Sequence, residues 1–256
     1  MPNETTFYDM VRNLLNGKAV YKRGLDSKET NHGTLKSTLA KLFRSRSNLQ
    51  YQYAFYNPMV RRLLIKDPIA CLSSEYFHQV FNVDTVILIR HPAAFVGSIR
   101  RLNWRFDFEN FYSQNHLMAR HLNPILKDCE TSQLSDIAEG ALLWKCIYQV
   151  LFCYLERNPK MIGVKHEDIS RSSPQTFRAL YQRLGIKYTP RIDQTIKSFT
   201  DNSNVTAPTD NKAHVLKRNS QANIKRWKGI LTEHEVELIK NITGGLASQY
   251  YSDDEW

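Results

Sequence analysis

Arg90 and Ser98 are the residues whose types and spacing most clearly point to chemistry. An unbroken apolar run at residues 86–89 ends in Arg90, and His91-Pro92 then opens a helix of small residues that carries Ser98. A cation at the carboxyl end of a buried strand, followed at once by a helix N-terminus, is how α/β proteins build anion sites. Proline suits the first helical position because its missing N–H donor costs nothing there. The segment therefore predicts a site for phosphate or a similar anion.

The elements that position this segment alternate between short apolar strands and helical patterns. Strands are expected at residues 63–65, 86–89 and 161–164. Helices are expected at residues 7–15, 34–43, 69–81, 136–158, 173–185 and from 232 onward, with shorter ones within residues 103–133. Strands that alternate with helices predict an α/β fold with a parallel sheet covered by helices.

Two helix starts carry capping signals. The sequence DIAE at residues 136–139 resembles a capping box, and TEHE at residues 232–235 predicts a well-capped final helix. The first of these helices is expected to end at Asn158-Pro159, since proline cannot continue a helix.

Composition favours a soluble protein with an anionic partner. The chain has 256 residues with 42% hydrophobic content, which is enough for one domain with a real core. Its formal net charge is +10, from 35 Lys and Arg against 25 Asp and Glu. Such a balance suits a nucleotide, a sulfated or phosphorylated ligand, nucleic acid or an anionic surface.

The cysteines and the apolar runs bear on the compartment. The four cysteines follow no CxxC spacing, so core packing in a reducing compartment is preferred to disulfides. The first thirty residues contain no apolar signal-peptide core, and no run reaches the length of a membrane span. A cytoplasmic location without an integral membrane segment is therefore expected.

Four motifs follow one another in order along the chain. They are Lys66-Asp67-Pro68, the Arg90/Ser98 pair, VKHEDI at 164–169 with the helix of 177–185, and NIKRWK at 223–228. The series resembles the core of the sulfotransferases that use 3′-phosphoadenosine 5′-phosphosulfate (PAPS), and is closest to a bacterial-type branch. The resemblance runs from about residue 60 to the end. It implies a P-loop-NTPase-like, three-layer α/β/α fold around a parallel sheet.

The resemblance also implies roles for individual residues. Arg90 and Ser98 match the pair that binds the 3′-phosphate of PAPS. Lys66 matches the catalytic lysine that contacts the transferring sulfuryl group. Trp227 lies in the segment that closes over the nucleotide. The other candidates for binding the nucleotide are the cations in and near this segment, Arg218, Lys225 and Lys228.

The activity implied is transfer of a sulfuryl group from PAPS to a hydroxyl or amine of a small-molecule or glycan acceptor. No metal is expected, and positioning and charge stabilisation carry such reactions. Pro68 occupies a position where soluble members often carry a histidine, so no general base is assigned. The acceptor and the oligomeric state stay open, because acceptor pockets lie in variable loops.

One family element has no counterpart in the sequence. Sulfotransferases open with a strand and a Gly-rich loop that holds the 5′-phosphosulfate, whereas nothing before residue 60 combines the two. The sequence HGTLKST at 32–38 imitates such a loop, but the polar residues 21–32 cannot supply the buried strand before it. The expected organisation is one domain, with an atypical region at 1–60 and a family-like core at 61–256. Whether the first central strand is present stays open.

Structural explanations compete with some of these roles. Arg90 alone could be an ion-pair partner at a strand end, and Ser98 alone could be a small residue at a helix–sheet contact. For residues 166–168 (HED), packing and capping are preferred to metal or acid–base chemistry, because neighbouring side chains on an extended segment point to opposite faces. Trp227 could stack on an adenine, although aromatic residues more often pack in a core.

Two other function classes remain open. The chain could be a catalytically impaired nucleotide-binding relative or an N-terminally truncated fragment, which the missing loop favours. A basic nucleic-acid-binding protein ranks last, because the cations are scattered and no helix-turn-helix, zinc or RNA-binding signature occurs. No nucleic-acid partner is therefore expected.

Overall fold

The computed structural model describes residues 4–18, 46–60, 62, 64–66, 70–201, 203–204, 217 and 219–256. The chain divides into two compact units, Met1–Asp67 and Pro68–Trp256. This division lies close to residue 60, where the sequence predicts the family-like core to begin. The described residues are mostly helical and contain one small parallel sheet, which is compatible with an α/β fold.

The N-terminal unit contains α1 (Glu4–Leu15) and α3 (Arg46–Tyr56). Helix α1 confirms the helix expected at 7–15. It ends at Leu15, and the chain turns at Gly17, whose φ of 73° is in the left-handed region and where an added Cβ would collide with the ring of Phe55. Gln52 fixes this turn, because its Nε2 donates to the Gly17 carbonyl at 3.2 Å. The helix expected at 34–43 and the loop-like sequence at 32–38 lie outside the described residues.

The strand expected at 63–65 is wrong at the two positions that the structure describes. Leu64 and Ile65 are in no strand, and they are 93% and 52% exposed. A strand forms only where its backbone N–H and C=O groups pair with a neighbour, and neither residue pairs with another described strand. An apolar triplet by itself does not supply that neighbour.

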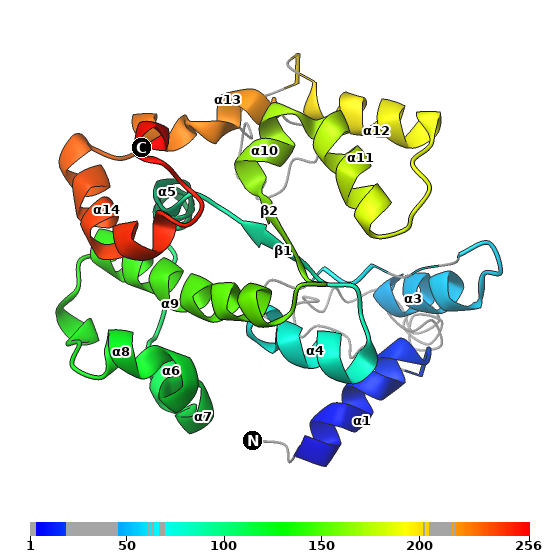
Figure 1. The fold of residues 1–256 in the computed structure, drawn as a ribbon, viewed down its shortest axis with the longest axis horizontal. Coiled ribbons are helices and arrows are strands. Elements are labelled where there is room, and N and C mark those ends of the chain that lie inside the picture. The colour runs from blue at the N-terminus through cyan, green and yellow to red at the C-terminus, as the bar shows by residue number, and fades with distance from the viewer. Residues whose placement is uncertain are drawn as a thin grey trace, which may run out of the picture. The chain divides into compact units, whose positions relative to one another are not determined.

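The C-terminal unit holds the sheet and most of the helices (Figure 1). Its strands are β1 (Val86–Ile89) and β2 (Ile162–Lys165). Its longer helices are α4 (Ser74–Phe81), α5 (Pro92–Arg101), α9 (Asp136–Arg157), α11 (Ser173–Arg183), α12 (Pro190–Thr200) and α14 (Glu233–Ala247). Shorter helical segments are η1 (Ala70–Ser73), α6 (Glu109–Tyr112), α7 (Asn115–Leu117), η2 (Met118–Leu122), α8 (Asn123–Leu126), η3 (Thr131–Gln133), α10 (His166–Arg171), α13 (Ser220–Ile224), η4 (Arg226–Gly229) and η5 (Asp253–Glu255).

The two strands pair in parallel, with Val86 opposite Ile162 and Ile89 opposite Lys165. The first was expected at these residues, and the second is shifted by one residue from the expected 161–164. On β1, Ile87 and Ile89 are buried, whereas Val86 and Leu88 are 39% and 48% exposed. One face of this strand therefore packs in the core, and the carboxyl ends of both strands meet at one edge.

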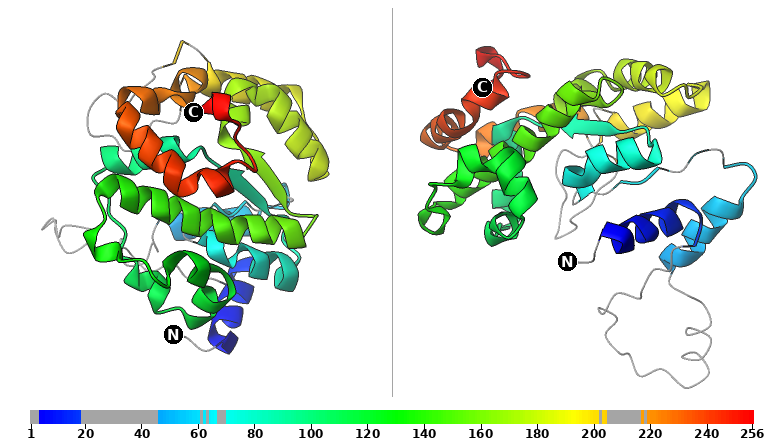
Figure 2. Two further views of the ribbon diagram at one scale, coloured as in Figure 1. Left: turned by 60° about the vertical axis from the view of Figure 1, so that its left-hand side comes forward. Right: turned by 60° about the horizontal axis from the view of Figure 1, so that its bottom comes forward.

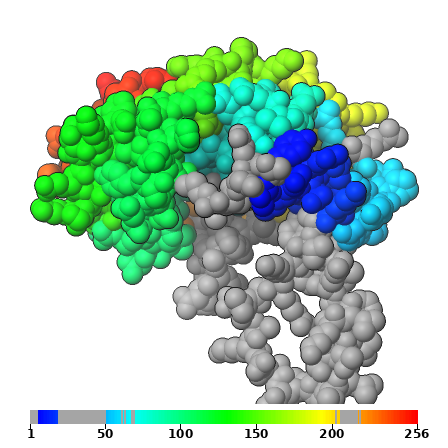
Figure 3. All heavy atoms as spheres, turned by 90° about the horizontal axis from the view of Figure 1, so that it is seen from below, coloured from blue at the N-terminus to red at the C-terminus, as the bar shows by residue number. Residues whose placement is uncertain are grey.

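Helix α9 is the centre of the core. Its Trp144 is fully buried, and α5 and α14 both pack along it. Figure 1 and the left view of Figure 2 show α14 beside α9, with the short helices α6 to α8 on its other side. The close approach of α5 requires a glycine on α9, since a Cβ at Gly140 would lie 2.8 Å from Ile99 Cδ1. In the space-filling view of Figure 3, the green atoms on the left form one continuous surface.

The predicted helix cap is present at α14 and wrong at α9. At α14 the capping box of Thr232 and Glu235 is present as predicted. At α9 the capping residue is Ser135, whose Oγ accepts from the Ala138 N–H at 3.3 Å. Glu139 instead accepts from Arg105 Nε at 2.7 Å and from the Phe106 N–H at 2.8 Å. Its carboxylate therefore binds the loop after α5 rather than the helix start.

Two negative findings concern the described residues alone. None of the helices in the described ranges combines the length and the apolar character that a bilayer crossing requires. Those ranges also bring together no group of three His, Cys, Asp or Glu side chains suited to a metal ion. The four cysteines are free thiols.

Candidate functional site: a cationic cavity at the carboxyl edge of the strand pair

The backbone of Arg90 is fixed by two aromatic side chains of α9. The Arg90 N–H donates to the Tyr148 hydroxyl at 3.0 Å, and the Tyr148 hydroxyl donates to the Leu88 carbonyl at 3.1 Å. Trp144 Nε1 donates to the Arg90 carbonyl at 2.8 Å. The end of β1 is therefore tied to the buried face of α9, which sets the direction in which the arginine side chain leaves the sheet.

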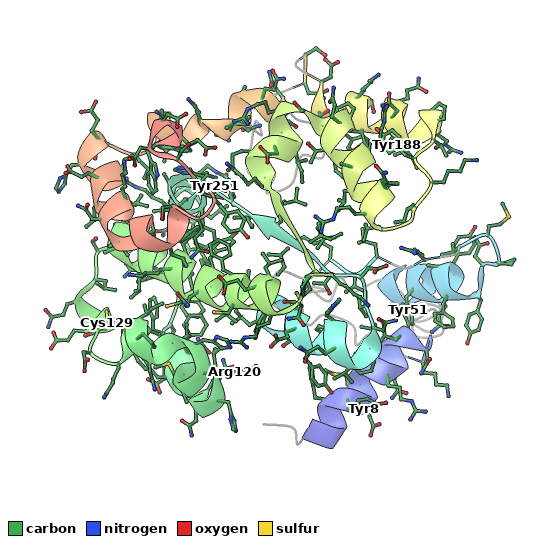
Figure 4. The ribbon with its side chains drawn as sticks, viewed as in Figure 1. Tyr8, Tyr51, Arg120, Cys129, Tyr188 and Tyr251 are labelled. Carbon is green, nitrogen blue, oxygen red and sulfur yellow. The ribbon has the colours of Figure 1, made fainter. Side chains whose placement is uncertain are left out.

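The start of α5 is held by His91 and by the carboxylate of Glu167. His91 Nδ1 accepts from the Ala93 N–H at 3.2 Å and so caps the helix. The His91 N–H donates to Glu167 Oε1 at 3.1 Å, and the Tyr251 hydroxyl donates to Glu167 Oε2 at 2.8 Å. Figure 4 shows Tyr251 after α14, beside the start of α5. Glu167, only 3% exposed, thus joins the end of β1, α10 and the C-terminal segment.

An open cavity of about 220 Å³ lies beside these residues, between α5, α10 and the segment of α13 and η4. Its arginines are Arg90, which follows β1, Arg101 on α5 and Arg226 on η4, and His166 of α10 adds an imidazole ring. Its neutral hydrogen-bonding groups are Ser98, Ser170, Ser220 and Asn223. The volume is many times the 10–15 Å³ that a single water needs, so the cavity can take a phosphate-sized group.

The guanidinium of Arg90 is the central group of this cavity. Its Nε is buried and has no hydrogen-bond partner among the described residues. Burial lowers the pKa of Arg90, and the nearby Glu167 carboxylate opposes that shift. Because an arginine stays protonated under all ordinary conditions, a buried positive charge with an unpartnered donor lines a polar cavity. This combination is typical of an anion site.

The cavity brings together three of the predicted residues. Arg90, Ser98 and Trp227 all line it, although Trp227 lies far along the chain from the other two. Lys225 lines a smaller hollow of about 120 Å³, which Trp227 separates from the first. Lys228 Nζ donates to the Trp256 carbonyl at 2.9 Å and lies 5.1 Å from the centre of the Trp227 ring.

The other predicted residues do not line this cavity or are not described. Lys66 belongs to the N-terminal unit, where it is exposed, and it follows residues that form no strand. The expectation that it stands at the end of a paired strand is therefore wrong for the described structure. Arg218 lies outside the described residues.

The sequence interpretation missed several lining residues that helical spacing could have found. Arg101 follows Ser98 by three residues on α5, and Ser170 follows His166 by four on α10. Residues at such spacings share one helix face. Arg226 lies in the segment 223–228 that the sequence singled out, but its place in the cavity depends on how η4 meets α5.

Gly97, which has no side chain, allows η4 to approach α5 closely. A Cβ at Gly97 would lie 3.3 Å from the Cβ of Trp227, so a side chain there would press on η4. Trp227 also stacks in parallel on the His91 ring, with centroids 5.3 Å apart, and is 4% exposed. Trp227 is therefore mainly a core residue, and its indole also lines the cavity.

Residues 166–168 have different surroundings: Glu167 is buried, whereas His166 lines the cavity. The side chain of Glu167 caps and packs, as the sequence analysis preferred. The Asp168 side chain is half-exposed, and its Oδ1 lies 3.5 Å from Arg171 Nη1. His166 differs from that preference, because its ring lines the cavity.

His91 should make the stability of the protein depend on pH. Burial lowers the pKa of His91 to about 4, against 6.5 for an ordinary histidine. The unfolded chain therefore binds more protons than the folded one between these values, and stability falls as the pH falls from about 6.5 to about 4. The free energy of unfolding should drop by about 3 kcal/mol from this group, as measured by urea unfolding across that range.

The control for this prediction is His91→Asn, which keeps a side-chain acceptor for the Ala93 N–H but has no titrating ring. The variant should lose the part of the pH dependence between about pH 6.5 and 4 that the ring contributes. A stability curve with the same slope in both proteins would show that His91 is not the source.

The described fold and site define an α/β protein with a cationic cavity at the carboxyl edge of a parallel strand pair. Comparison with known proteins found no matching protein-family model, no matching curated protein and no matching solved structure.

Proposed function

We propose that the cavity binds the 3′-phosphate of a 3′-phosphoadenosine nucleotide and that the protein is a PAPS-dependent sulfotransferase. The observation that carries the proposal is the buried Arg90 guanidinium, which lines the cavity with an unpartnered Nε. Ser98 and Trp227, selected from the sequence for the same nucleotide, line that cavity too. The meeting of two separately chosen motifs, the Arg90/Ser98 pair and the segment of Trp227, in one cavity supports this ligand over an unspecified anion.

The chemistry assigned to each group follows from its type. The planar fork of Arg90 suits two oxygens of one phosphate, and the Ser98 hydroxyl can donate a single further bond. Arg101 and Arg226 add positive charge from the two sides of the cavity. In this proposal Lys225 and Lys228 attract the nucleotide. The acceptor is a hydroxyl or amine of a small molecule or glycan.

The finer fold belongs to the same proposal. The parallel pair of β1 and β2, with α9 against one face, forms part of a P-loop-NTPase-like three-layer sheet. The half-exposed side chains of Val86 and Leu88 support a second covering layer on the other face of β1.

A catalytically impaired nucleotide-binding relative is the second candidate function. The specific observation in its favour is the sequence before residue 60, which has no apolar strand followed by a Gly-rich loop. Binding without sulfuryl transfer is the result that this candidate predicts. A nucleic-acid-binding function fits less well, because the cations are scattered along the sequence and no nucleic-acid-binding signature occurs.

The test compares binding with transfer. Adenosine 3′,5′-bisphosphate (PAP) at about 100 times its Kd should stabilise the protein by about 3 kcal/mol and raise its Tm by roughly 5–10 °C. Adenosine 5′-phosphate, which lacks the 3′-phosphate, should give a clearly smaller shift at equal concentration. Transfer of labelled sulfuryl from PAPS to a panel of hydroxyl and amine acceptors then separates the enzyme from the impaired relative. No shift with PAP or PAPS would overturn both.

A further inference from the structure

His166 is the only histidine among the described residues that line the cavity. It is the first residue of α10 and follows directly on β2, so it stands at the same sheet edge as Arg90. Its side chain is about one-third exposed. The ring therefore lies at the boundary between the buried Arg90 guanidinium and the open part of the cavity.

The charged groups around His166 come from each of the surrounding elements. Arg90 at the end of β1, Arg101 on α5 and Arg226 on η4 are cations of the same cavity. Opposing them is Glu167, whose Oε1 lies 4.0 Å from His166 Nδ1. That carboxylate already accepts from the His91 N–H and the Tyr251 hydroxyl. Of these charges, Arg90 and Glu167 are the two that act on the ring most directly.

This environment disfavours the protonated form of His166 in the unliganded protein. Burial lowers the pKa of His166, the positive charge of Arg90 lowers it further, and the Glu167 carboxylate raises it in part. An anion in the cavity would reverse the balance, because it adds negative charge next to the ring and screens it from the arginines. Protonation of the ring and binding of an anion must then favour each other.

We infer that His166 is a ligand-binding residue of the cavity, which takes up a proton when a phosphomonoester dianion binds and holds that dianion as an imidazolium. This inference rests on the proposed function and names the ligand class of the same cavity. Arg90, Arg101 and Arg226 line the cavity, and an imidazolium at His166 adds one more positive charge, so a phosphomonoester of charge about −2 gains more attraction there than a phosphodiester of charge −1. The cavity should therefore select terminal phosphate groups over diesters.

Isothermal titration of PAP in buffers of different ionisation enthalpy measures the proton uptake directly. At about pH 6, near the ordinary histidine pKa of about 6.5, wild-type protein should take up a substantial fraction of one proton more per PAP than His166→Gln. The titration of the ligand itself is common to both proteins and cancels in that difference. Adenosine 3′,5′-cyclic phosphate, a diester, should bind at least about 10-fold more weakly than PAP to wild type, which is a loss of about 1.4 kcal/mol.

The control is His234→Gln, an exposed histidine at the start of α14, which should leave both affinity and proton uptake unchanged. His166→Lys serves as a second variant, because a permanent charge should retain binding without the uptake. If His166→Gln or His166→Lys binds PAP with the uptake of wild type, the inference is overturned while the proposed function stands. If both variants fold but neither binds PAP, the inference is also overturned, because a positive charge at position 166 would then not be enough for binding. A wild-type protein that does not bind PAP would instead refute the proposed function.

Discussion

Arg90→Ala is expected to weaken the binding of PAP about 100-fold or more. A truncated partner in a buried, hydrogen-bonded charge pair typically costs 2–5 kcal/mol, about 30-fold to several thousand-fold in affinity. A loss within this range is expected here, because Arg90 Nε is buried and the backbone of Arg90 is fixed by Trp144 and Tyr148. Isothermal titration with PAP measures the effect.

Two matched variants make the result specific. Arg90→Lys keeps the charge but not the planar fork, so its affinity should fall between those of wild type and Arg90→Ala. Arg183→Ala removes an exposed cation of α11 that does not line the cavity, and it should bind PAP as wild type does. The free energy of unfolding of unliganded Arg90→Ala should stay close to that of wild type, since the Nε has no partner to lose. Unchanged PAP affinity in Arg90→Ala would refute the site.

Trp144→Ala should give the largest loss of stability among the substitutions considered. Trp144 is fully buried in the centre of α9 and donates to the Arg90 carbonyl. Removal of a buried tryptophan leaves a cavity and costs about 3–5 kcal/mol, to which the lost hydrogen bond adds about 1 kcal/mol. Urea unfolding measures this change as a lower midpoint with a similar slope.

The control for Trp144→Ala is Trp104→Ala, in which a tryptophan that is 48% exposed is truncated. This substitution should lower the free energy of unfolding by about 1 kcal/mol or less, as at most surface positions. Trp144→Phe should lie between the two, because it keeps most of the packing and loses only the donor to the Arg90 carbonyl. A Trp144→Ala protein as stable as Trp104→Ala would contradict the central place of α9 in the core.

Elements with strong local signals were predicted with few errors. Residues 86–89 form β1 at the expected bounds, and Thr232 and Glu235 form the expected capping box of α14. Both carry a clear local signal, an apolar run with a proline after it or two side chains that bond to nearby N–H groups, and β1 also has its partner strand β2. The same kind of signal located the end of α9, where Asn158-Pro159 stops the helix.

Elements that depend on distant partners were not predicted. The triplet at 63–65 has the composition of β1, but Leu64 and Ile65 pair with no described strand and stay exposed. Glu139 has the spacing of a capping box, yet its carboxylate binds Arg105 and the Phe106 N–H instead. In each case a tertiary contact, or its absence, outweighed the local preference.

The sequence by itself determined that a cation ends a buried strand and that Ser98 follows on the next helix, because both result from local order along the chain. Only the tertiary structure decided which groups meet that cation. Gly97 lets Trp227 and η4 approach α5, which places Arg226 opposite Arg90. Helix α10 adds His166 to the same cavity through the pairing of β2 with β1. These contacts join residues more than seventy positions apart, and such pairings are set by packing of the whole core rather than by any local pattern.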